Sequence, residues 1–429
     1  MGRIYICIDL KSFFASVECS ERGLDAMTTN LAVCDLTRSE KTICLAITPA
    51  MKALGIKNRC RVFEIPKNVE YIAAPPRMQL YIDYAAKIYA IYLRYISKED
   101  IYVYSIDEAF MDVTDYLLMY NMTARELGQT IMETIYYELH IRATCGIGTN
   151  LYLAKIALDI TAKHAADFIG ELTEESFIND LGKHRPLTDF WRIGPGISRR
   201  LAQYGIYTNE DIRNADTDLL YRLFGVDAEL LIDHAYGREP VTIKDIKSYR
   251  PSTSSISSGQ VLMRDYSYSE ARLIIKEMTD LMCLDIVDKD VYTDSVSLTL
   301  IYSNESGHPA SNKSVKLPDA TDSDLILIPR LLSLYDGIAS RFAPIRKINI
   351  SFNNLKPKEF VQYDFFTDPA TLEKNNRMQK AVIDIKKRFG KNAILKGMNL
   401  EKGGTTIERN MQIGGHRSGI ETDTPHEHP

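Results

Sequence analysis

Three acidic residues lie where apolar, strand-like segments of the chain end. Asp9 follows a short β-branched run, and Asp107 and Glu108 separate two apolar segments, residues 101–106 and 109–113. This pattern predicts a hairpin with two carboxylates at its tip. Carboxylates that converge on one sheet edge repel one another unless a cation lies among them, and magnesium prefers such oxygen ligands. The residues therefore indicate magnesium-dependent phosphoryl transfer. The alternative for each acid, taken alone, is a solvated turn residue.

Hydrophobic periodicity around these acids predicts a mixed α and β domain. Alternating or β-branched segments predict strands at residues 4–8, 31–35, 42–47, 101–106, 109–113 and 142–147. Amphipathic segments predict helices from residue 13 and at 51–54, 78–96, 123–139 and 151–163. A split βαβ, ferredoxin-like sheet accommodates this order.

The second half of the chain divides by composition. Residues 171–243 are helical in pattern and contain a Gly-Pro-Gly turn. We expect a polar linker at 244–251 and a second α/β unit at 252–355. The remainder, 356–429, is expected to be a tail rich in Lys and Arg whose polar end is disordered.

Length and composition bound the class of protein. A chain of 429 residues exceeds what one hydrophobic core usually serves, so several domains are expected. No signal peptide is visible and no apolar run approaches the ~20 residues of a bilayer span, so we expect a cytoplasmic protein without a membrane partner. Seven cysteines without a Cys-x-x-Cys pair indicate reduced thiols and no zinc site. The net charge of −5 argues mildly against a dedicated nucleic-acid-binding domain, but a large acidic enzyme can carry a basic groove.

Three segments closely resemble, in order, the catalytic motifs of Y-family (translesion) DNA polymerases. They are Ile8–Glu18, Tyr104–Val113, and Gly146–Asn150 followed by Leu153–Ala157. With the helical segment and the second α/β unit, the resemblance extends over most of the chain. Within the family, the chain is most similar to bacterial UmuC-like members, the DNA polymerase V branch.

The resemblance implies an α+β multidomain fold, the polymerase right hand. It has a ferredoxin-like palm, small fingers, a helical thumb and an α/β little-finger domain. The implied boundaries are palm 1–28 and 75–170, fingers 29–74, thumb 171–243, linker 244–251, little finger 252–355 and tail 356–429.

The resemblance also assigns the catalytic and metal-binding residues. Asp9, Asp107 and Glu108, with the backbone carbonyl of Leu10, are implied ligands of two Mg²⁺ ions. Lys155 is implied to contact nucleotide phosphates from a helix. The alternative for Lys155 is an exposed helix lysine.

Nucleotide selection is expected to depend on two aromatic residues and the fingers. Phe14 matches the steric-gate position that excludes a ribose 2′-hydroxyl, and its neighbour Phe13 is expected to face the other way. The alternative for Phe14 is a plain core aromatic, and an error of one residue would exchange the two. Lys52 remains a candidate phosphate contact, although Lys lacks the bidentate fork of the Arg often found there. Pro49 replaces a common Tyr and cannot donate a side-chain hydrogen bond, and we assign no metal role to Lys11.

A turn after the palm is expected to hold DNA. Gly194 and Gly196 resemble a helix-hairpin-helix element, whose backbone N–H groups bind a phosphate without reading bases. Arg199 and Arg200 could add positive charge. The alternative is a simple helix C-cap.

A short peptide after the second α/β unit resembles the sliding-clamp-binding peptide of bacterial polymerases. Gln362, Phe365 and Phe366 carry the resemblance. Aromatic residues are costly to leave exposed, so a partner pocket is expected. The alternative is packing on the enzyme itself.

The expected function is template-directed, low-fidelity DNA synthesis past damaged bases, in an SOS-type repair response. Its partners would be primer-template DNA, deoxynucleoside triphosphates and the sliding clamp. Two rival functions are a non-catalytic scaffold, which should have lost its acids, and a nucleotide cyclase, which would not need the second half of the chain.

Overall fold

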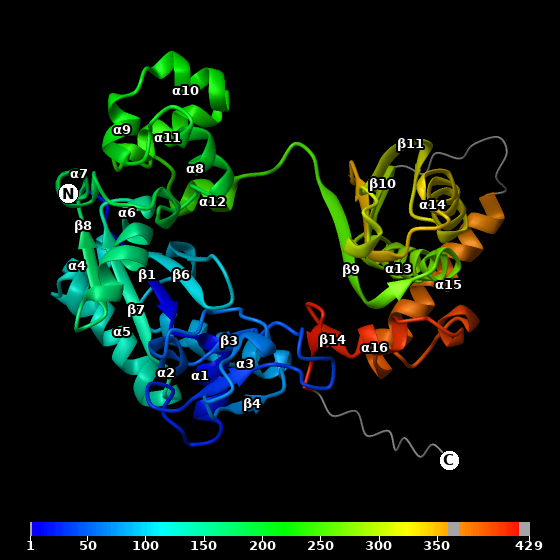
Figure 1. Ribbon diagram of the computed structural model, residues 1–429, viewed down its shortest axis with the longest axis horizontal. Coiled ribbons are helices and arrows are strands. Elements are labelled where there is room, and N and C mark those ends of the chain that lie inside the picture. The colour runs from blue at the N-terminus through cyan, green and yellow to red at the C-terminus, as the bar shows by residue number, and fades with distance from the viewer. Residues whose placement is uncertain (1, 359–368, 420–429) are drawn as a thin grey trace. The chain divides into compact units, whose positions relative to one another are not determined.

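The computed structural model describes residues 2–358 and 369–419, which fall into two compact units, Met1–Tyr249 and Arg250–Pro429 (Figure 1). All seven cysteines are buried and free of disulfides. Within the described ranges, no helix combines the length and hydropathy that a bilayer span requires.

The larger sheet of the first unit has the strand order β5-β6-β1-β7-β8. Its strands are β1 (Tyr5–Leu10), β5 (Ile101–Val103), β6 (Glu108–Asp112), β7 (Ala143–Gly148) and β8 (Ile169–Leu172). Central β1 pairs antiparallel with both β6 and β7. The helices around the sheet are α1 (Phe13–Ser20), α3 (Met78–Tyr92), α4 (Thr114–Tyr120), α5 (Ala124–Leu139) and α6 (Leu151–Ile156), the last continued by a π-helical turn, Ala157–Thr161.

Alternate residues of β1 enter two different cores. Ile6 and Ile8 pack in the core that contains α1, α3 and α5. Tyr5 and Cys7 pack in a smaller core with residues of α6. Because successive side chains of a strand point to opposite faces, Asp9 lies on the α6 side of the sheet.

The predicted hairpin at 101–113 is tighter than expected. Strand β5 ends at Val103, because the N–H groups of Tyr104 and Ser105 both donate to the Glu108 carbonyl, at 3.0 and 3.1 Å. Glu108 is therefore the first residue of β6, and only Asp107 lies in the turn.

A second sheet of this unit has the order β3-β2-β4. It consists of β2 (Leu31–Val33), β3 (Ala46–Ile47) and β4 (Ile72–Ala74), and helix α2 (Pro49–Ala53) follows β3. The predicted strand 42–47 is shorter than expected, because Thr42 donates its N–H to Ser39 in a turn. Upstream of β3, Ile43 forms only an isolated bridge with Arg61.

A helical part completes the first unit around a core that includes Phe177, Phe190 and Leu201. Its helices are α7 (Glu174–Leu181), α8 (Pro195–Ala202), α9 (Asn209–Asn214), α10 (Thr217–Phe224), α11 (Asp227–Ala235) and α12 (Ile243–Ser248). Short 3-10 turns of the chain occupy Val62–Glu64, Lys98–Asp100, Ala162–His164, Leu187–Asp189, Asn304–Ser306 and Gly397–Leu400.

The expected linker at 244–251 is wrong for most of its length, because α12 occupies it. Thr242 and Asp245 form a capping box that starts this helix. Lys247 donates to the Glu99 carbonyl at 3.0 Å, and Ile243 is buried in the core beside β1. The helix thus belongs to the first unit.

The second unit contains a four-stranded antiparallel sheet with the order β11-β10-β12-β9. Its strands are β9 (Ser255–Tyr266), β10 (Val291–Tyr302), β11 (Ser311–Thr321) and β12 (Ile345–Asn353), and short β13 (Lys356–Pro357) pairs with β10. Helices α13 (Tyr268–Asp288) and α14 (Asp324–Ile338) share its buried core. The hydrophobic pattern did not predict β11, an exposed edge strand that tolerates Pro318.

Residues beyond 368, expected as a tail, form a folded C-terminal module instead. It comprises α15 (Pro369–Phe389), α16 (Thr406–Asn410), β14 (Gln412–Ile413) and β15 (His416–Arg417). The Glu277 carboxylate, on α13 and 2% exposed, accepts hydrogen bonds from Thr405 N at 2.8 Å and Asn399 Nδ2 at 3.0 Å. The Lys396 ammonium joins Asp280 and Asp324, at 2.5 and 2.7 Å. Composition alone could not predict this docking, because the acidic partners lie far earlier in the sequence.

Replacing Lys396 with Met should loosen the C-terminal module. Two buried carboxylates would lose their shared cation, which is strongly unfavourable in a poorly solvated site. We expect amide hydrogen exchange in α15 and at residues 405–406 to accelerate by about tenfold or more. Lys387→Met removes an exposed pair with Asp288 and is the matched control, with an effect of about twofold or less. Equal acceleration in both variants would contradict this account.

Candidate active site

Strand register brings the predicted acids together. Asp9 lies directly opposite Glu108 in the β1–β6 pairing. Leu10 N donates to the Asp107 carbonyl at 2.9 Å, so the turn residue is fixed against the end of β1. Residues paired across an antiparallel ladder point to the same face, so Asp9 and Glu108 share the α6 side of the sheet.

Asp9 and Glu108 lie in a site that opposes their ionisation. Burial raises the pKa of Asp9 to about 7, and the negative charges of Asp107 and Glu108 contribute to the increase. Burial also raises the pKa of Glu108, although the Lys155 ammonium opposes that shift. The site therefore concentrates negative charge that favours a cation.

Helix α6 brings a lysine to these acids. A Cβ added to Gly146 or Gly148 would lie 2.1–2.2 Å from backbone atoms of Ala154, so only glycines let α6 approach β7 this closely. Lys155 Nζ lies 3.0 Å from Glu108 Oε2, and its side chain is only 10% exposed. Lys155 is thus not the exposed helix lysine of the alternative interpretation.

A second acid contacts the same ammonium. Lys155 Nζ also lies 3.0 Å from Oδ2 of Asp159. Burial alone would lower the pKa of Lys155, but Asp159 and Glu108 outweigh it and raise the pKa above its ordinary value. The motifs did not single out Asp159, and its i,i+4 spacing from Lys155 was the available signal.

The donor chemistry fits a divalent cation, but its candidate ligands are engaged with protein groups. Among residues 2–358 and 369–419, no three His, Cys, Asp or Glu side chains form a ready metal-binding cluster. Both Glu108 oxygens accept hydrogen bonds, from Cys7 Sγ at 3.3 Å and Lys155 Nζ at 3.0 Å. Asp107 accepts one from Ser105 Oγ at 2.6 Å. A cation bound by all three carboxylates would share their oxygens with these protein groups.

Cations gather near the acids from separate segments. Burial lowers the pKa of Lys52, the positive charge of Lys163 adds to this, and Asp9 opposes it. Burial likewise lowers the pKa of Lys11, with Lys52 and Lys163 contributing. Lys11 also lies over the Phe168 ring, 4.1 Å from its centroid. No sequence pattern singled out Lys163, because its relation to Lys11 and Lys52 depends on the fold.

The two candidate gate residues have different surroundings. Phe13 is 2% exposed and belongs to the core beneath the sheet. Phe14 is half-buried and stacks on Tyr81, with ring centroids 4.6 Å apart. Phe14 is therefore the more accessible ring of the pair.

The Gly-Pro-Gly turn begins a helix rather than ending one. Gly194 is the N-cap of α8 and Pro195 is its first residue, so the C-cap alternative is wrong. Arg199 Nε donates to the Pro195 carbonyl at 3.2 Å. Arg200 donates to the Leu223 carbonyl at 2.7 Å, so part of its guanidinium braces the helical part itself.

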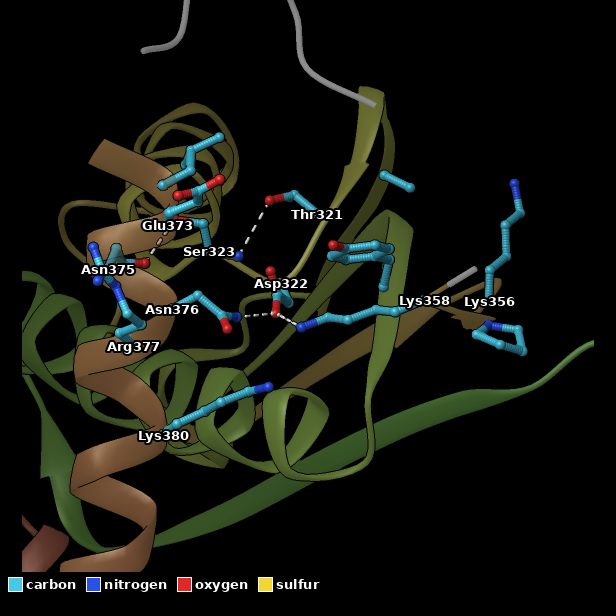
Figure 2. A pocket seen from close by; sticks show the side chains of 14 residues that line it. Thr321, Asp322, Ser323, Lys356, Lys358, Glu373, Asn375, Asn376, Arg377 and Lys380 are labelled. Carbon is cyan, nitrogen blue, oxygen red and sulfur yellow. Dashed lines mark hydrogen bonds and ion pairs between the residues drawn. The ribbon is translucent and has the colours of Figure 1, made fainter. Parts of the chain in front are cut away.

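The candidate clamp residues Gln362, Phe365 and Phe366 lie outside the described residues. The second unit has a pocket of about 600 Å³, lined in part by Asp322, Lys358 and Asn376 (Figure 2). Figure 2 shows Lys358 paired with Asp322, to which Asn376 also donates at 3.0 Å. Each lysine that lines this pocket is paired with an aspartate, and none of the predicted catalytic residues lines the pocket.

Changing Asp9 to Asn should stabilise the protein in the presence of a chelator, in a pH-dependent way. The folded state retains a proton on Asp9 up to about pH 7, whereas the unfolded state releases it near pH ~4. Wild-type stability is therefore lost between these pH values, while Asn does not titrate. The gain in Tm should grow from about pH 4 to about pH 7 and then level off. The control is Asp83→Asn, at an exposed position. A gain that does not vary with pH would contradict the burial argument.

Comparison with known proteins places these features in a family. The impB/mucB/samB family matches residues 8–159, and the impB/mucB/samB family C-terminal domain matches residues 253–365. The chain is 28% identical over 420 residues to UvrX of Bacillus subtilis (strain 168), which is named for UV-damage repair, with 96% of this chain and 97% of the relative covered. It is 29% identical over 425 residues to DNA polymerase IV 2 of the same organism, with 96% and 98% covered. The narrower expectation of a UmuC-like branch stays a prediction.

A solved structure shares the fold. The Y-family DNA polymerase chimera Dbh-Dpo4(243-245)-Dbh aligns with a TM-score of 0.64 at 19% identity, covering 83% of this chain and all of that chain. This likeness confirms the predicted α+β right-hand class. The two family matches together span more than half of the chain in the expected order, and the chain belongs to the impB/mucB/samB family, the Y family of DNA polymerases.

Proposed function

We propose that this protein is a DNA-directed DNA polymerase that extends primers past damaged template bases, with Asp9, Asp107 and Glu108 as its catalytic carboxylates. The observation that carries the proposal is the strand register that pairs Asp9 with Glu108 and fixes Asp107 beside them. The names of the relatives, a UV-damage repair protein and DNA polymerase IV 2, support the same biological role.

The three carboxylates and the carbonyl of Leu10 would hold two Mg²⁺ ions. When bound, magnesium supplies the positive charge that lowers the barrier to in-line displacement at a phosphoryl group. The protein contributes a rigid sheet edge on which the carboxylates keep their spacing. Burial at this edge raises the pKa values of Asp9 and Glu108, and a cation in such a poorly solvated place would interact strongly with them.

The lysines would orient the deoxynucleoside triphosphate. Lys52 and Lys155 supply charge from α2 and α6, and Lys11 and Lys163 add to it. Phe14, the accessible ring, would lie under the sugar and exclude a 2′-hydroxyl. These groups bind and position the substrate before any bond changes.

Elements other than the catalytic carboxylates would hold the duplex of the primer-template DNA. The N-terminus of α8, with Gly194 and Gly196, offers backbone N–H groups to a phosphate, and Arg199 adds positive charge. The division of the first unit into palm, fingers and thumb at the expected boundaries belongs to this proposal. So does a cytoplasmic location.

The double variant Asp107→Ala, Glu108→Ala should abolish primer extension. Loss of two carboxylates removes the cation site, while primer-template binding should stay within a few-fold because other elements hold the DNA. Primer extension with magnesium and all four deoxynucleotides measures the first, and fluorescence anisotropy measures the second. Near-normal extension would contradict the proposal.

Phe14→Ala should raise ribonucleotide incorporation relative to deoxynucleotide incorporation by about a hundredfold or more, because the clash with the 2′-hydroxyl disappears. Single-nucleotide insertion kinetics with matched ribo- and deoxynucleotides measure the ratio of kcat/KM. Phe13→Ala is the matched control, since it changes the adjacent core ring. If only Phe13→Ala relaxes sugar choice, the gate is Phe13.

Replacing Phe365 and Phe366 with Ala should remove the stimulation of extension by a loaded sliding clamp. The prediction is supported by the sequence Gln362-Tyr363-Asp364-Phe365-Phe366, which resembles a clamp-binding peptide. The two Phe residues are replaced because buried aromatic anchors supply most of the binding energy of such contacts. A tether raises effective concentration without changing chemistry, so extension without clamp should hardly change. If both activities fall together, these residues stabilise the polymerase itself. If neither falls, the clamp peptide lies elsewhere.

A further inference from the structure

Lys155 neutralises the carboxylate that the proposed function assigns to a metal. Its ammonium contacts Glu108 Oε2 at 3.0 Å, and Cys7 Sγ occupies the other oxygen. Each oxygen of Glu108 therefore accepts one hydrogen bond, and the charge of the carboxylate is balanced without an added cation. A cation that binds Glu108 shares this carboxylate with the Lys155 ammonium, and the two positive charges repel each other.

Asp159 is a second acidic partner of the Lys155 ammonium. It lies 3.0 Å from Lys155 Nζ and is one turn further along, in the π-helical turn Ala157–Thr161. Its side chain is 28% exposed, compared with 9% for Glu108. Lys155 can therefore release Glu108 without losing all ionic contact, by moving toward the better solvated carboxylate.

We infer that Lys155 is an internal counter-ion that occupies Glu108 until a divalent cation displaces it, and that Asp159 is the positioning residue that receives the displaced ammonium. This role rests on the proposed function, because it requires Glu108 to bind the cation. In this arrangement the cation and the lysine compete for one carboxylate. A triphosphate that draws Lys155 away favours cation binding, and cation binding favours the triphosphate by the same factor.

Two variants of this network should change metal affinity in opposite directions. Lys155→Met keeps the buried stem but removes the competing charge, so metal should bind about tenfold more tightly. Asp159→Asn leaves Lys155 with Glu108 as its remaining acidic partner, so metal should bind about threefold more weakly. A role limited to folding would lower affinity in both variants.

The double variant separates positioning from direct attraction. If Asp159 acts through Lys155, Asp159→Asn should have no effect in the Lys155→Met background. If its charge attracts the metal directly, the threefold loss should persist in that background. Lys155→Arg changes the side chain but keeps the positive charge, so it should bind metal within about threefold of wild type. A gain in affinity confined to Lys155→Met therefore reflects the lost charge and not a disturbed fold.

The test is a titration of the full-length chain, without DNA or nucleotide, with Mn²⁺, following the free ion by electron paramagnetic resonance. Thermal unfolding of every variant shows whether it is folded. The expected order of affinity is Lys155→Met and the double variant, then wild type and Lys155→Arg, then Asp159→Asn. If a folded Lys155→Met variant binds Mn²⁺ no more tightly than wild type, Lys155 is not a competing counter-ion. If Asp159→Asn still weakens Mn²⁺ binding in the Lys155→Met background, Asp159 does not act by positioning Lys155.

Glu108→Gln distinguishes failure of this inference from failure of the proposed function. It should weaken Mn²⁺ binding by about tenfold or more if Glu108 is a ligand. If Glu108→Gln leaves the affinity unchanged, the ligand assignment itself is wrong. If Glu108→Gln weakens binding but Lys155→Met does not strengthen it, only the counter-ion is rejected.

Discussion

Carboxylates packed side by side at a poorly solvated sheet edge must either keep a proton or share a compensating cation, and the architecture of the first unit reflects this constraint. Asp9 and Glu108 face each other across β1 and β6, and burial raises the pKa of both. Breaking a buried ion pair is costly because one charge remains uncompensated. Lys155 supplies the compensation from within the chain. In the proposed function, the same repulsion that destabilises the fold would give the site an affinity for an added cation.

The surrounding elements are arranged to keep that edge in place. Gly146 and Gly148 let α6 lie directly on β7, which delivers Lys155 to the acids. Ile6 and Ile8 anchor the opposite face of β1 in the large core, so the strand cannot shift without disrupting both sides. The packing of β1 and the close approach of α6 to β7 therefore hold the backbone positions of the carboxylates, so their spacing depends on the fold more than on side-chain rotation.

Sequence alone predicted the acids, the central strands and the family, because motif order and a period of two are local signals. It could not predict the partners of Glu108, since Cys7 and Lys155 reach it through register and helix packing. It missed β11, an edge strand with weak alternation, and the docking of residues beyond 368. Asp159 and Lys163 were missed for the same reason: their significance depends on neighbours distant in sequence.

Anomalous diffraction from crystals of the full chain, soaked with Mn²⁺ in the presence of primer-template and a non-incorporable deoxynucleotide, would locate the cation relative to the three carboxylates. We expect a manganese peak between the carboxylates of Asp9, Asp107 and Glu108, with Lys155 withdrawn from Glu108. A peak that contacts none of these carboxylates, in crystals that retain the nucleotide, would contradict this expectation.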